Sequence, residues 1–203
     1  NHGCLVDLCA SSGHAALPFG CRPEPAWTAL LEEDSVDLAT VESLLLRPMP
    51  GLFLLASPMV PLVERELSRT AASALLDVVR QHFSLVIIDA PSTLNCAAAA
   101  ALEAATAFWL VVTPDPASIQ TTLGTVRALG EPTAQLRLIL NHVNSTHQIS
   151  RNTVERVLNH PVAGLVPFDP EQAKALGRGK PLAMVTPDSP LPEAVEGLAR
   201  DFI

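Results

Sequence analysis

The chain contains short runs of apolar residues that glycine, proline and polar residues interrupt. These runs lack the alternation of apolar and polar side chains that a half-exposed strand shows, and they lie at 4–6, 52–55, 85–88, 108–112, 136–140 and 165–166. Continuous apolar runs of this length are typical of strands that are buried on both faces. The pattern therefore predicts a parallel sheet with these six segments as its strands.

Segments with helical periodicity lie between most of these runs. In 66–83, the apolar residues recur so that Leu67, Ala71, Leu75 and Val78 fall on one stripe of a helix. Capping residues that precede proline, or open a helical segment, mark further helix starts; they are Asp115, Ser150, Asp169 and Ser189. Alternating strands and helices predict a doubly wound, mostly parallel α/β sheet flanked by helices. With no linker and no internal repeat, we expect a single domain over 1–203.

Composition narrows the function classes. The chain has 203 residues, a net charge of −8, and 13 lysine and arginine residues against 21 acidic ones, which disfavours broad nucleic-acid binding. No run of about 18 uncharged apolar residues could span a bilayer, and the first residues do not resemble a signal peptide. We therefore expect a cytoplasmic protein. The four cysteines form no closely spaced pair, so we expect neither a zinc finger nor a redox motif.

Polar residues follow the apolar runs at the places where a doubly wound sheet binds its ligands, outside the carboxyl ends of its strands. They are Asp7, Cys9, Ser57, Asp89, Thr113, Asp115, Asn141, Pro167 and Asp169. The sharpest of these features is Asp89, which directly follows the run 85–88. A carboxylate at this point suits a Mg²⁺ ion, bound through water beside nucleotide phosphates. A cap of the next helix explains the same residue equally well.

Five segments in order resemble motifs of the MinD/ParA class of P-loop ATPases. Residues 87–91, Ile-Ile-Asp-Ala-Pro, resemble the Walker B segment of that class. Residues 5–9, with Gly13 and 19–20, are similar to the switch region, and residues 112–115 are similar to the strand end before the next helix. Residues 138–143 are similar to the adenine-recognition segment, and residues 166–182 are similar to the closing VPxD…A…GKPL stretch. The resemblance covers nearly the whole chain.

The resemblance implies a role for several of the residues at strand ends. Asp89 would hold Mg²⁺ through water, and Asp7 matches the first switch acid. Cys9 stands where the class has the aspartate that polarises the attacking water. A thiol is a poor general base at neutral pH, so we expect slow hydrolysis, or binding of ATP without turnover. A strand-end cap is the alternative reading of Asp7.

The same resemblance places the adenine base near three residues of the C-terminal half. Asn141 would recognise the adenine edge, since its amide can donate and accept a hydrogen bond at once. Pro167 would pack flat against the purine, and Asp169 belongs to the closing stretch of the nucleotide site. The expected cofactors are therefore ATP and Mg²⁺. A turn-forming role is the alternative for Asn141.

Within the class, residues 51–58 resemble a segment of the CpaE/TadZ branch, whose members help to assemble and localise pili. This likeness implies a homodimer with pilus-assembly or polar-localisation proteins as partners, peripheral to the inner membrane through those partners. The residues 198–203 lack the cation-rich face of a membrane-targeting helix, so we expect no direct membrane targeting.

No P-loop sequence occurs in the chain. Residues 177–181 are not a substitute, because proline follows the lysine and no strand precedes them. The class places its first strand and P-loop before the position of residue 1, so we expect the chain to lack about one βα unit of a longer protein.

Three functional hypotheses are left open by these residues. The first is an ATP-dependent, dimerising spatial regulator or assembly factor with weak or lost hydrolysis. The second is a non-catalytic scaffold that keeps the fold and acts through protein contacts only, so the sequence leaves open whether the chain is an enzyme. The third, a reductase similar to the nitrogenase iron protein, needs paired cluster cysteines, and Cys96 has no suitable partner near Val112.

Overall fold

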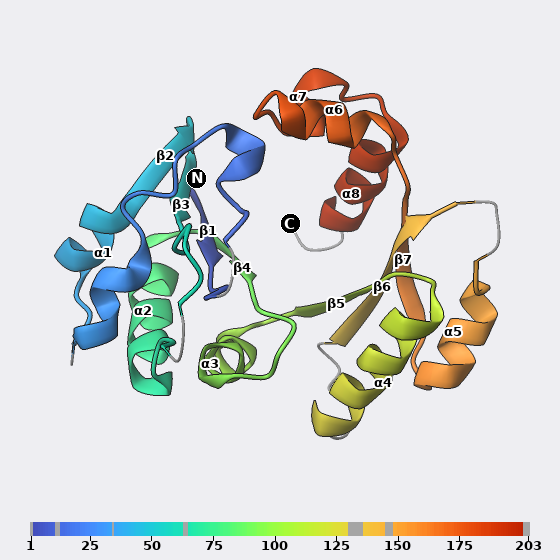
Figure 1. Ribbon diagram of the computed structural model, residues 1–203, viewed down its shortest axis with the longest axis horizontal. Helices are drawn as coiled ribbons and strands as arrows, with labels where there is room; N and C mark the ends of the chain where they lie inside the picture. Colours follow the sequence, from blue (N-terminus) through green and yellow to red (C-terminus); the bar gives the residue numbers. More distant parts are fainter. Residues whose placement is uncertain are drawn as a thin grey trace. The chain divides into compact units, whose positions relative to one another are not determined.

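The computed structural model describes residues 2–10, 13–33, 35–62, 65–129, 136–144 and 148–200. The chain divides into two compact units, the first made of 1–105 with 176–180 and the second of 106–175 with 181–203. Each unit has its own sheet and is described by itself (Figure 1). The expectation of a single domain over 1–203 stays a prediction.

The first unit is built on a four-stranded sheet in the order β2-β3-β1-β4. Its strands are β1 (Gly3–Asp7), β2 (Leu45–Met49), β3 (Leu52–Leu55) and β4 (Leu85–Asp89). Both β3 and β4 run parallel to β1, whereas β2 pairs antiparallel with β3. The parallel pairing of β1 with β4 places the carboxyl ends of these two strands side by side, with Asp7 opposite Asp89.

Helices cover this sheet and close a core of aliphatic side chains around β1. They are the 3-10 turns η1 (Leu17–Phe19) and η2 (Trp27–Glu32), and the helices α1 (Leu38–Leu44), α2 (Arg69–His82) and α3 (Cys96–Ala104). As the sequence predicts, α2 buries Ala71 and Leu75 on one stripe. The Ser68 hydroxyl caps its first turn by accepting a hydrogen bond from the Ala71 amide at 3.0 Å.

The second unit is built on a three-stranded parallel sheet in the order β5-β6-β7. Its elements are β5 (Phe108–Val112), α4 (Pro116–Leu129), β6 (Leu136–Val143), α5 (Arg151–Leu158), β7 (Val162–Pro167), α6 (Glu171–Gly177), α7 (Leu182–Val185) and α8 (Pro190–Arg200). Helices α4 and α5 lie on one face of this sheet and α8 on the other (Figure 1). The helix starts predicted at Asp115, Ser150, Asp169 and Ser189 are confirmed within one or two residues.

The predicted strands all occur, but the expectation that they are buried on both faces is wrong for β4 and β5, and also for β7, where Leu165 is 41% exposed. Leu85 and Ile87 of β4 are 45% and 56% exposed, and Val111 of β5 is 56% exposed. Within the described ranges, β4 pairs only with β1 and β5 only with β6, so each is an edge strand. One face of β4 packs on the core through Val86 and Ile88, and the other face is left open.

Two further results concern elements outside the predicted set. Strand β2 was not predicted, because Arg47 and Pro48 interrupt its apolar pattern. Among the described residues, no helix is both long enough and apolar enough to cross a membrane.

Candidate functional site

Three side chains that can bind cations meet at the carboxyl ends of β1 and β4. Asp7 ends β1, Asp89 ends β4, and Cys9 lies two residues beyond Asp7. One carboxylate oxygen of each aspartate and the thiol sulfur all lie within 4.8 Å of one another. Asp7 is buried, Cys9 is half-buried and Asp89 is exposed, so the cluster is fixed at its base and open to solvent at its rim.

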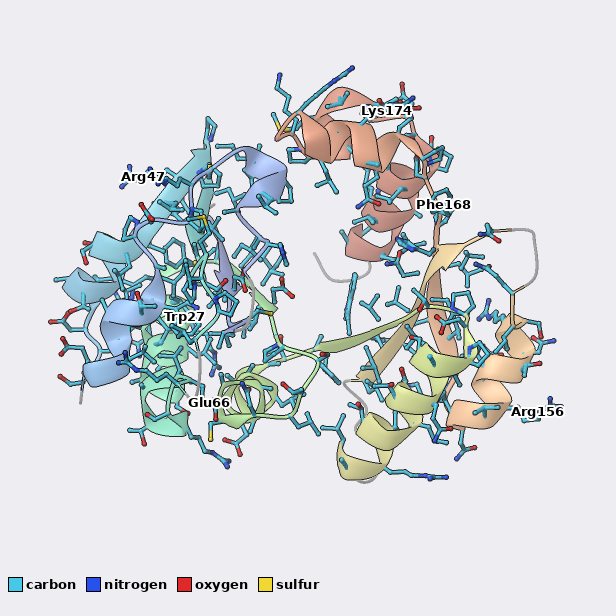
Figure 2. The ribbon with its side chains drawn as sticks, viewed as in Figure 1. Trp27, Arg47, Glu66, Arg156, Phe168 and Lys174 are labelled. Atoms are coloured by element: carbon cyan, nitrogen blue, oxygen red, sulfur yellow. The ribbon has the colours of Figure 1, made fainter. Side chains whose placement is uncertain are left out.

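The buried member of the cluster, Asp7, is held rigidly. Its Oδ1 accepts a hydrogen bond from the Cys9 amide at 3.0 Å, and its Oδ2 accepts one from the Ala15 amide at 3.2 Å. The indole Nε1 of Trp27 donates a hydrogen bond of 2.7 Å to the Asp7 main-chain oxygen. Figure 2 shows Trp27 among the packed side chains of the first unit. Both the backbone and the carboxylate of Asp7 are therefore positioned before any ligand binds.

Desolvation dominates the electrostatics of the cluster, and crowding of groups that become negative when ionised adds to it. Burial raises the pKa of the Cys9 thiol to about 12, with further contributions from the charges of Asp89 and Asp7 and from a hydrogen bond to Asp7. Although the residue is exposed as a whole, partial desolvation of its carboxyl group raises the pKa of Asp89, reinforced by the charge of Asp7 and opposed by His14. At neutral pH the thiol is thus protonated, and a bound cation would favour the ionised form of each group.

A buried hydroxyl without a hydrogen-bond partner lies next to the cluster. Ser57, just beyond β3, is fully buried, and within the described part of the chain its Oγ has no partner. A Cβ atom on Gly13 would lie 1.4 Å from this Oγ and 3.1 Å from Oδ2 of Asp7. The hydroxyl therefore occupies the space beside Gly13 that adjoins the Asp7 carboxylate. Such an orphaned buried group is costly unless a ligand or water satisfies it.

In the second unit, Asn141 and Pro167 lie near the carboxyl ends of neighbouring parallel strands. Asn141 is half-buried in β6, and Pro167 ends β7 opposite Val143. The register between β6 and β7 shifts after Leu140, and His142 adopts a left-handed backbone conformation with φ of 56°. Asn141 therefore lies within an irregularity of the β6–β7 pairing, between Leu140 and Val143.

Asp169 has its hydrogen bonds satisfied within the second unit. It is buried, and its Oδ1 accepts a hydrogen bond from the Glu171 amide at 3.0 Å. Its Oδ2 accepts hydrogen bonds from the Ser189 hydroxyl and, at 3.5 Å, from the Leu191 amide. The Ser189 bond, first, and these amide bonds lower the pKa of the Asp169 carboxyl. Asp169 thereby joins the starts of α6 and α8, and its role toward a nucleotide stays a prediction.

The structure therefore brings Asp7, Cys9 and Asp89 together in the first unit, as expected for strand-end residues. The predicted residues Asn141, Pro167 and Asp169 belong to the second unit.

Two residues next to the cluster were not predicted. No pattern in the sequence pointed to Trp27, which is twenty positions from Asp7 in the chain. His14 was the second residue missed. Its position next to Gly13, in the loop that follows β1, could have identified it.

The donor set fits magnesium only in part. Two carboxylates are suitable ligands for this hard cation, directly or through water, and they fit the Mg²⁺ role expected for Asp89. A thiol is not, because sulfur ligands favour softer metals. The Cys9 sulfur is thus the group that departs from a magnesium site.

Comparison with known proteins gives a consistent fold. No protein-family model matches the chain. An uncharacterised ATP-binding protein of Methanocaldococcus jannaschii is 31% identical over 133 residues, which is 64% of this chain and 50% of that protein. The chain thus spans about half the length of the curated relatives it matches.

Solved structures agree over nearly the whole chain. A ParA family ATPase from Chlorobium tepidum superposes with a TM-score of 0.82 at 18% identity, covering 96% of this chain and 82% of that one. The septum site-determining protein MinD of Pyrococcus horikoshii, solved with Mg-ADP, superposes with a TM-score of 0.77 at 18% identity, covering 95% and 79%. The chain therefore has the MinD/ParA P-loop ATPase fold, a mostly parallel arrangement of strands flanked by helices.

Proposed function

We propose that the chain is part of an ATP-binding spatial regulator or assembly factor of the MinD/ParA type, in the CpaE/TadZ-like branch. The observation that carries this proposal is the pairing of Asp7 with Asp89 at the carboxyl ends of adjacent parallel strands. In doubly wound sheets, ligands bind at this edge. The relatives named above, one called an ATP-binding protein and one solved with Mg-ADP, support the choice of nucleotide.

The proposed roles of the residues follow from their positions. The Asp89 carboxylate, exposed at the end of β4, would hold Mg²⁺ through water, and the rigid Asp7 carboxylate would orient that water. Asn141 and Pro167 would contact the adenine base, with Asp169 fixing the loop after β7. When bound, the magnesium ion would neutralise charge on the phosphates. Since residues 1–203 contain no P-loop, we expect the missing strand and loop in the longer natural protein.

Slow hydrolysis is part of the proposal. A residue that polarises the attacking water must accept a proton, and the raised pKa of the Cys9 thiol, about 12, keeps it protonated at neutral pH. Nucleotide binding would then act as a slow switch. The switch would control a homodimer that recruits pilus-assembly or polar-localisation proteins, in the cytoplasm or at the inner membrane through those partners.

Calorimetry with ATP and Mg²⁺ tests the proposal on the longest natural protein that contains residues 1–203. We expect binding that depends on Mg²⁺, a large loss of this dependence in Asp89→Asn, and no change in Glu103→Gln. Glu103 is the matched control, since it is an exposed acid of α3 that pairs with Arg69 away from the cluster. No binding heat in the wild-type protein would contradict the switch and favour the non-catalytic scaffold.

The isolated chain gives a second measurement. Residues 1–203 alone should bind ATP weakly, because the phosphate cradle supplies much of the affinity. Micromolar binding by this chain would overturn the assignment of the phosphate site to the missing P-loop. A Cys9→Asp variant of the longer protein should hydrolyse ATP faster than the wild type, and an unchanged rate would contradict the role given to this position.

A further inference from the structure

The cluster at the ends of β1 and β4 combines two kinds of metal ligand. Asp7 and Asp89 provide carboxylate oxygens and Cys9 provides sulfur, all within 4.8 Å of one another. Zinc binds sulfur at about 2.3 Å and carboxylate oxygen at about 2.0 to 2.2 Å, so one ion bridges such a triangle after small side-chain rotations. His14, which interacts electrostatically with Asp89, adds an imidazole close to the same edge.

From this geometry we infer that Asp7, Cys9 and Asp89 form a binding site for a borderline divalent transition metal, Zn²⁺ or Co²⁺, in the absence of nucleotide. Mixed sulfur and oxygen donors favour these ions over Mg²⁺, which prefers oxygen ligands alone and gives up its water reluctantly. The inference does not rest on the proposed function, since it needs only three side chains of the first unit and no ATP.

The buried Ser57 hydroxyl is an independent observation that points to a ligand. Its Oγ is fully buried, has no partner within the described part of the chain, and lies beside the carboxylate of Asp7 across the missing side chain of Gly13. Metal-binding carboxylates are commonly held by outer hydrogen bonds, which orient them toward the ion. The Cys9 and Ala15 amides already hold Asp7 in this way. The Ser57 hydroxyl lies near this carboxylate without a hydrogen bond to it, and a metal-bound water at the cluster would supply the partner that the hydroxyl lacks.

The accessibility of the cluster is also suited to an exchangeable ion. Asp7 at its base is buried, whereas Asp89 at its rim is exposed. An ion can therefore enter from solvent and meet ligands whose base is already fixed. The remaining coordination positions would be filled by water, as in open metal sites.

Titration of residues 1–203 with Co²⁺, in a thiol-free reducing buffer without nucleotide, tests the inference. A cobalt–thiolate bond gives a charge-transfer absorption in the near ultraviolet, which carboxylate ligands do not produce. We expect this band to saturate at one Co²⁺ per chain and Zn²⁺ to abolish it, while a large excess of Mg²⁺ leaves it unchanged. Cys9→Ser should lose the band. Cys96→Ser, which changes an exposed free cysteine of α3, is the matched control and should keep it.

Two further variants separate ligation from general damage. Asp89→Asn should keep the fold, measured by circular dichroism, and weaken Co²⁺ binding by about tenfold or more. Ser57→Ala should weaken it by about 10- to 100-fold, the usual effect of removing an outer partner of a metal ligand. A wild-type chain without the band, a band that survives Cys9→Ser, or displacement by Mg²⁺ would each overturn the inference. ATP binding by the longer protein is measured separately by calorimetry, so failure of the Co²⁺ titration and failure of the proposed function can be told apart.

Discussion

The Oγ of Ser57 fills the position that a side chain on Gly13 would need, because a Cβ atom there would lie 1.4 Å from it. This close approach joins the loop after β1 to the end of β3. The same Cβ would lie 3.1 Å from Oδ2 of Asp7, so the loop can follow this path only with glycine at position 13. The hydroxyl and the carboxylate are thereby held next to each other at the base of the cluster.

Replacing Gly13 with alanine should therefore destabilise the first unit. The methyl group must displace Ser57, which is fully buried, and overpacking of this kind costs about 1 to 3 kcal/mol. We expect a lower urea midpoint with an unchanged slope. The double variant Gly13→Ala with Ser57→Gly should recover most of the loss, because it removes the atom that the methyl group meets. A double variant no more stable than Gly13→Ala would contradict this account.

The hydrogen bond from Trp27 to the Asp7 main-chain oxygen gives a second prediction. Trp27→Phe removes the 2.7 Å bond at a fully buried position, which costs about 1 to 3 kcal/mol in the free energy of unfolding. Since the backbone of Asp7 is then less well held, Co²⁺ binding should also weaken. Trp109→Phe in β5 is the matched control, and it should leave the Co²⁺ titration unchanged. Equal effects of the two variants on Co²⁺ affinity would rule out a positioning role for Trp27.

The cluster of Asp7 and Asp89 could be predicted from the sequence for a simple reason. Each residue ends an apolar run, and the carboxyl ends of neighbouring parallel strands lie at one edge of a sheet. The bond from Trp27 could not be predicted in the same way. It joins positions twenty residues apart through a 3-10 turn, where no periodicity marks which side chain points inward.

The exposure of β4 marks a second limit of sequence reasoning. Four apolar residues, 85–88, indicate that the strand favours burial, but they do not say whether a neighbour is present on each side. Strand β2 was missed for the opposite reason. The charged residue Arg47 gave no indication of a strand in the sequence. In the structure its Cζ lies over the ring of Phe53, 4.9 Å from the ring centroid, and this contact accommodates the charge within β2.

The open face of β4 predicts self-association of residues 1–203. Among the described residues, β4 pairs with another strand on one side only, and an unpaired strand edge recruits other strands. Ile87, on the open face of the same strand, is 56% exposed and adds an apolar contact surface. We expect the apparent mass in sedimentation to rise with concentration, and Ile87→Lys to reduce the rise. Val157→Lys changes a residue of α5 that is 43% exposed and serves as the matched control, with no effect expected. A monomeric wild-type chain at high concentration would contradict this prediction.

The hydrogen bond from Ser189 to Asp169 predicts a pH dependence of stability. This bond is the largest cause of the lowered pKa of Asp169, so the ionised carboxylate stabilises the fold above its unfolded pKa of about 3.9. That contribution is lost as the pH falls through the folded pKa. Ser189→Ala should therefore be less stable than the wild type at pH 7, and the difference in the free energy of urea unfolding should shrink on acidification. In an Asp169→Asn background, the effect of Ser189→Ala should not vary with pH. A difference that grows toward low pH would reverse the sign and contradict the assignment.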